Sequence, residues 1–108
     1  MSLTESQFQK VVKKKLDKVD GLYYFVKEAK AIRGIPDIVG CLRGHFFAME
    51  LKKSQSEAQK NTGRIVLQRY TLRQIGLAHG LGYLVHPDNL DEVLADLLKR
   101  CSRKVFLP

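Results

Sequence analysis

The stretch that decides the fold is DIVGCLRGHFFAMELK, residues 37–52. Its two runs of mainly apolar, β-branched and aromatic residues predict two strands. Between them stands Arg43-Gly44, a two-residue connection typical of a β-hairpin, with glycine where a positive φ is needed. If these two residues form the turn, counting outward along both strands puts Asp37 directly opposite Glu50. Directly opposed residues share one face of a sheet, so the hairpin is expected to bring two carboxylates together.

Strand alternation adds a third charged group to this face. Lys52 lies on the same side as Glu50, while Leu51 points the other way. Opposed carboxylates repel each other, and a bound divalent cation is one reason for a fold to keep them. Such a metal can bind a phosphate oxygen and activate water, with Lys52 orienting that water or stabilising charge on the phosphorus. The alternative interpretation is that Lys52 neutralises a surface Asp–Glu pair.

Outward from the hairpin, hydrophobic periodicity predicts three helices and two further strands. The predicted elements are a helix over 4–18, a strand over 22–26, a polar loop over 54–63, a helix over 67–79, a strand over 82–86 and a helix over 90–100. The order is therefore α-β-β-β-α-β-α. This order predicts an α/β fold in which a mixed β-sheet is flanked by helices.

Length and composition bound the class of protein. The chain has 108 residues and is 44% hydrophobic, which predicts one folded domain over residues 1–108 and excludes overall disorder. No apolar run approaches the ~20 residues of a membrane span, and the N-terminus lacks a signal-peptide pattern. We therefore expect an intracellular, cytoplasmic protein with no membrane partner.

The charge balance points to a polyanionic partner. Lys and Arg number 19 against 11 Asp and Glu, so the net charge is +8. Nucleic acid is the first candidate and an anionic membrane surface the second, with solvating surface charge as the alternative. Cys41 and Cys101 show no metal-binding spacing, which argues against zinc, and both are expected to be small buried hydrophobes.

Two short motifs carry a family resemblance. Residues 34–37, Gly-Ile-Pro-Asp, followed by 50–52, Glu-Leu-Lys, resemble the PD-(D/E)xK nuclease motif. The Gly-x-Pro-Asp form in so small a chain resembles the virus-type replication-repair nuclease (VRR-NUC) family, from about residue 5 to residue 85. The resemblance implies a restriction-endonuclease-like core and Mg²⁺- or Mn²⁺-dependent cleavage of DNA phosphodiesters, without a small-molecule cofactor. It implies that Lys52 is the catalytic lysine and that the metal is bound by Asp37, Glu50 and the backbone carbonyl of Leu51.

Two further positions match the family pattern. Family members often carry a glutamate on the first helix, matched by Glu5, which the resemblance places in the site as a further metal ligand. The alternative is that Glu5 only caps the start of this helix. They also tend to carry a glutamine at the start of the helix after the Glu-x-Lys strand, matched by Gln68. Gln68 shares a helical stripe with Leu72 and Ile75, so it faces the sheet, either as a site residue or as a buried structural amide.

Basic residues around the site are expected to contact backbone phosphates without reading base sequence. They are Lys27, Lys30, Arg33, Lys53, Lys60, Arg64, Arg69 and Arg73. The resemblance to junction-resolving enzymes with this core predicts a homodimer acting on four-way or other branched DNA. The last helix and residues 105–107 are expected either to form the dimer interface or to complete the core.

The resemblance also indicates a role in replication, repair or phage DNA processing, a phage-encoded protein acting in its bacterial host being one case. The competing hypothesis is a non-catalytic basic module that binds nucleic acid and retains the nuclease fold. Tight duplex binding without metal-stimulated cleavage would favour that second hypothesis.

Overall fold

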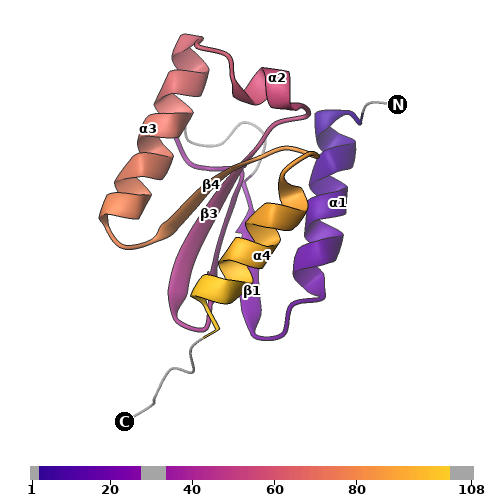
Figure 1. The fold of residues 1–108 in the computed structure, drawn as a ribbon, viewed down its shortest axis with the longest axis vertical. Coiled ribbons are helices and arrows are strands. Elements are labelled where there is room, and N and C mark those ends of the chain that lie inside the picture. The colour runs from indigo at the N-terminus through magenta and orange to yellow at the C-terminus, as the bar shows by residue number, and fades with distance from the viewer. Residues whose placement is uncertain (1–2, 28–33, 103–108) are drawn as a thin grey trace.

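The computed structural model describes residues 3–27 and 34–102. Its elements, in chain order, are α1 (Glu5–Asp17), β1 (Leu22–Val26), β2 (Ile38–Leu42), β3 (His45–Leu51), α2 (Gln55–Ala58), α3 (Gly63–Leu77), β4 (Leu81–Val85) and α4 (Leu90–Arg100) (Figure 1). The predicted α/β class and order are confirmed with one addition. The segment expected to be a loop contains the short helix α2, and α3 begins four residues earlier than predicted.

The sheet is mixed and has the strand order β1-β2-β3-β4. β1, β2 and β3 pair antiparallel, whereas β4 pairs parallel to β3. Arg43 and Gly44 form the predicted hairpin turn, with φ values of 50° and 87°. Leu42 pairs with His45, as the two-residue turn requires, and the register runs on without a bulge to the far end of the hairpin.

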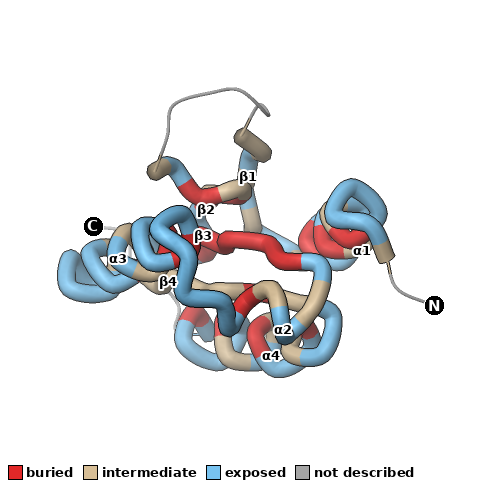
Figure 2. Tube along the Cα trace, turned by 90° about the horizontal axis from the view of Figure 1, so that it is seen from above, coloured by how far each residue is buried: buried red, intermediate tan, exposed pale blue. Residues whose placement is uncertain are grey.

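The main core lies on one face of this sheet, beneath α1 and α4 (Figure 2). Thr4 and Gln7 form a reciprocal capping box that fixes the start of α1. Helical spacing then turns its apolar stripe onto the strands, and α4 buries a second stripe beside it. The buried side chains are Phe8, Val12 and Leu16 of α1, Leu90, Val93 and Leu97 of α4, and alternate residues of β2, β3 and β4. The buried apolar face of α4 therefore completes the core.

α3 covers the opposite face, over β3 and β4 (Figure 2). It approaches the sheet closely at Gly82, where an added Cβ would lie 2.8 Å from the carbonyl oxygen of Leu72. Glycine is therefore required here by the backbone of the helix above it. This approach sets the height of α3 over the sheet, and with it the position of any α3 side chain that reaches the strands.

Gly82→Ala is expected to lower the free energy of unfolding by roughly 1–3 kcal/mol, because the methyl group forces α3 away from β4. Gly76→Ala is the matched control within α3, since an added Cβ there meets no atom within 4 Å. That variant should be more stable by about 0.5–1 kcal/mol. Urea unfolding of both variants measures the difference, and equal effects would contradict the close-approach argument.

The sheet face beside α3 leaves three aromatic side chains exposed. Tyr23, Phe25 and Phe46 occupy β1 and β3, and they share their face with Cys41 of β2. Cys41 is exposed, so the expectation that both cysteines are buried is wrong for it, whereas Cys101 is buried. The reason is that α3 lies over β3 and β4 and leaves β1 and β2 uncovered. Within the described residues, none of the helices is long and apolar enough to cross a membrane.

Candidate active site

Asp37 is held in place by the chain on either side of it, after β1 and at the end of β3. It directly precedes β2, and its backbone carbonyl accepts a hydrogen bond from the amide of Lys27 at 2.8 Å, which extends the pairing of β1 and β2. One side-chain oxygen, Oδ2, accepts a hydrogen bond from the amide of Leu51 at 2.8 Å. The carboxylate therefore reaches across to the end of β3.

Glu50 stands beside Asp37 and is buried, with only 3% of its surface exposed. Burial raises its pKa from 4.5 to about 8, and the neighbouring Asp37 carboxylate adds to the shift. The positive charges of Lys52 and Lys27 oppose the shift without cancelling it. The pair thus retains a proton at neutral pH when no cation is bound. A cation between the two carboxylates would take the place of that proton.

Gln68 joins the pair from α3. Its Nε2 donates a hydrogen bond to Oε1 of Glu50 at 3.0 Å, which confirms that this side chain faces the sheet. Its own Oε1 is buried and has no hydrogen-bond partner among the described residues. An unpartnered buried oxygen is costly unless a ligand or water completes it. Together with the two carboxylates, it gives a set of hard oxygen atoms that suits Mg²⁺ or Mn²⁺.

The carboxylates that the resemblance implies as metal ligands do not all lie together in the described part of the chain. Across residues 3–27 and 34–102, no group of three or more His, Cys, Asp or Glu side chains is placed to hold an ion. Glu5 is exposed on the first turn of α1 and does not form such a group with Asp37 and Glu50. An ion at the pair would therefore have two carboxylates and the backbone as protein ligands, with water at its other positions, as Mg²⁺ often does.

Lys52 connects the carboxylate pair to a pocket. Its amide donates to the carbonyl of Val85 at 2.8 Å, so its backbone continues the pairing of β3 with β4. Its side chain lines a pocket of about 690 Å³. Glu5 lines the same pocket. The structure thus brings Glu5 near Lys52, while Asp37, Glu50 and Gln68 form their own cluster.

The predicted basic contacts are distributed unevenly. Lys53, Lys60 and Arg64 line the pocket, and Arg73 is exposed farther along α3. Two others already bond to protein. Arg69 donates to the carbonyl of Ala58 at 2.6 Å and to Oδ1 of Asn61 at 2.9 Å, and Lys27 donates to the carbonyl of Ile35 at 2.9 Å. Lys30 and Arg33 lie outside the described residues, as do residues 105–107.

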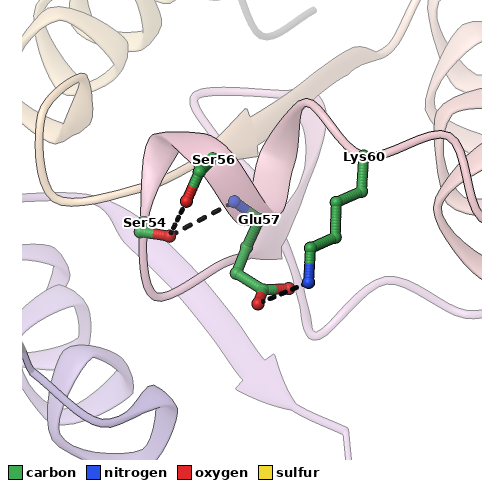
Figure 3. A network of polar contacts seen from close by, with 4 residues as sticks. All are labelled: Ser54, Ser56, Glu57 and Lys60. Carbon is green, nitrogen blue, oxygen red and sulfur yellow. Dashed lines mark hydrogen bonds and ion pairs between the residues drawn. The ribbon is translucent and has the colours of Figure 1, made fainter.

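The pocket wall includes residues that the sequence analysis did not single out. Ser54 caps α2 by accepting a hydrogen bond from the amide of Glu57, and Lys60 pairs with the Glu57 carboxylate at 3.0 Å (Figure 3). That ion pair holds the pKa of Glu57 below its usual value. Thr62 also lines the pocket, at the N-cap of α3. The signal for α2 is present in the sequence, because Ser followed by Glu three residues later marks a helix start.

The fold is similar to that of two solved structures. One, described as a VRR_NUC domain, has a TM-score of 0.64 and 20% identity, with 84% of this chain and 94% of that chain covered. The other, described as a VRR_NUC domain protein, has a TM-score of 0.65 and 18% identity, with 92% and 91% covered. No family model and no curated protein matches the sequence. The similarity extends over most of the chain.

Proposed function

We propose that this chain, which has the fold of VRR-NUC nuclease domains, is a metal-dependent endonuclease that hydrolyses DNA phosphodiesters. The observation that carries the proposal is the cluster at the end of β3. The buried Glu50 lies beside the half-buried Asp37 there, and the positive charge of Lys52 acts on Glu50. An opposed acidic pair costs stability, and the binding of a cation offsets that cost.

Each residue has a distinct part in this reaction. Asp37 and Glu50, with the carbonyl of Leu51, would hold Mg²⁺ or Mn²⁺, which supplies Lewis-acid polarisation of the scissile phosphate and a more acidic water. Lys52 holds its ammonium beside the site, where it stabilises negative charge that builds on the phosphorus oxygens. Gln68 positions Glu50 through its hydrogen bond. Glu5 contributes from the neighbouring pocket rather than from the carboxylate pair.

We further propose a homodimer that acts on branched DNA such as a four-way junction. Two copies related by a two-fold axis would present two active centres, one for each strand that is cut. The exposed Tyr23, Phe25 and Phe46 provide an apolar surface for self-association. α4 is a poorer candidate for this surface, because its buried apolar face packs within the core.

A cleavage panel tests the proposal. Linear duplex, single-stranded, flap and four-way junction DNA are each incubated with Mg²⁺, Mn²⁺ or EDTA, and the sedimentation of the protein is measured at micromolar concentration. We expect cleavage only with a metal, fastest on the junction, by a protein that sediments as a dimer. A monomer would contradict the dimer and weaken the junction preference. Tight binding without cleavage of any substrate would favour the non-catalytic binding module instead.

A further inference from the structure

The pocket beside Lys52 is positively charged and rich in hydroxyl groups. Its charged side chains are Lys52, Lys53, Lys60, Arg64, Glu5 and Glu57. Four cations against two carboxylates leave a net charge of +2, and Glu57 is already paired with Lys60. The hydroxyls of Thr4, Ser54 and Thr62 complete the polar wall. This combination suits an anion that carries several acceptor oxygens.

The N-terminus of α3 opens into the same pocket. α3 has 15 residues and no acidic side chain in its first turn, and Thr62 at its N-cap makes no capping hydrogen bond. The first amides of this helix therefore lack a side-chain acceptor, which helices normally obtain from the N-cap or from an anion. Gly63 leaves the approach open, because an added Cβ there would meet no atom within 4 Å.

Lys52 supplies an independent sign of a missing ligand. Its side chain is largely buried, with 8% of the residue's surface exposed, and among the described residues its ammonium has no hydrogen bond within 3.5 Å and no carboxylate oxygen within 4.0 Å. A lysine side chain buried to this extent is normally paired with an anionic group. By contrast, the exposed Lys60 in the same wall has its partner in Glu57 (Figure 3). The largely buried Lys52 is thus a cation left for a ligand that enters the pocket.

The pocket wall is also held in shape without a ligand. Arg69 bonds to Ala58 and Asn61, which ties α3 to the end of α2 and the segment after it. Ser54 caps the N-terminus of α2. A wall fixed in this way binds an anion without first ordering a loop.

We propose that this pocket holds a second phosphate group of the nucleic-acid substrate, next to the phosphate placed at Asp37 and Glu50. The first amides of α3, the Thr62 hydroxyl and the Arg64 guanidinium bind it, while Lys52 lies between the two phosphates. The inference rests on the proposed function. The chemistry is that of a phosphate, either a backbone phosphodiester or a terminal phosphate at a strand end.

Thr62→Asp gives the sharpest test, because it is expected to change stability and binding in opposite directions. The carboxylate would cap the free amides of α3, so the melting temperature should rise by a few degrees. The same carboxylate would occupy and repel the phosphate site, so affinity for duplex DNA should fall at least about tenfold. Thr62→Asn is the neutral control: it should also raise the melting temperature, with a smaller loss of affinity.

Affinity is measured in EDTA by fluorescence anisotropy, so that no cleavage occurs. Arg64→Ala should weaken binding and reduce the salt dependence of the binding constant by about one phosphate contact. Lys99→Ala removes the same charge from an exposed position in the last turn of α4 and should do neither. A Thr62→Asp protein that binds as tightly as wild type, or equal effects of the Arg64 and Lys99 variants, would overturn the proposal.

Two duplexes, with and without a 5′-phosphate, identify the source of the phosphate. A backbone phosphodiester predicts the same loss for Arg64→Ala on both duplexes. A terminal phosphate predicts a loss only on the phosphorylated one. These measurements do not require cleavage, so they test the pocket separately from the nuclease activity. If the protein cuts no DNA but Thr62→Asp still weakens binding, the pocket proposal stands and the proposed nuclease function fails.

Discussion

Asp37→Asn is expected to lower the rate of DNA cleavage by at least about 10²–10³-fold while the fold remains intact. The amide of asparagine keeps an oxygen that can accept the hydrogen bond now made by the amide of Leu51. The variant loses only the negative charge that would hold the cation. Single-turnover cleavage at saturating protein measures the chemical step separately from binding.

Asp20→Asn is the matched control, because Asp20 is exposed beyond the end of β1 that lies away from Asp37. It should cleave at the wild-type rate. Circular dichroism and urea unfolding check that both variants fold equally well. Undiminished cleavage by Asp37→Asn, with unchanged unfolding, would remove Asp37 from the site and with it the proposed role of the carboxylate pair.

Glu50→Gln should abolish cleavage and yet make the protein more stable at alkaline pH. The folded protein holds the Glu50 proton more tightly than the unfolded chain does, because its pKa is raised from 4.5 to about 8. The stability that Glu50 contributes is therefore fully present below pH 4.5 and is lost as the pH rises through 8. Glutamine carries no such proton, so the variant avoids this loss. At about 1.4 kcal/mol per pKa unit, the gain above pH 8 is on the order of a few kcal/mol.

Urea unfolding of both proteins from pH 5 to pH 9 gives the measurement. The two curves should diverge as the pH rises, and millimolar Mg²⁺ should stabilise the wild type at pH 8 but not Glu50→Gln. Glu57→Gln is the control with the opposite sign, since the pKa of Glu57 is lowered by Lys60 and its contribution is lost only in acid. Parallel curves for wild type and Glu50→Gln would contradict the raised pKa of the buried Glu50 beside Asp37.

The sequence predicts the hairpin and its charged face well, because these depend on local rules. A two-residue turn leaves one possible register, and alternation then decides which side chains share a face. The opposition of Asp37 and Glu50 and the placement of Lys52 follow from that count alone. Gln68 also follows, since its helical stripe includes Leu72, which packs against the sheet at Gly82.

Other features depend on tertiary packing, which cannot be predicted from hydrophobic periodicity in the sequence. The start of α3 is missed because this helix exposes apolar residues such as Val66, Leu67 and Tyr70, which blurs its amphipathic pattern. α2 is only one turn long. Glu5 lies on the first turn of α1, where it is exposed and lines the pocket. That pocket forms where α1, the end of β3 and the segment before α3 meet.

The hairpin turn at Arg43-Gly44 has a consequence for how this protein tolerates change. It lies at the opposite end of the hairpin from the carboxylates, yet it alone sets which residues of β2 and β3 face each other. Exchanging Arg43 for asparagine, which also accepts a positive φ, would leave the pairing intact. Inserting one residue there would slide every downstream partner by one position and separate Asp37 from Glu50. In relatives of this chain, we therefore expect the residue types of this turn to vary while its length of two residues is kept.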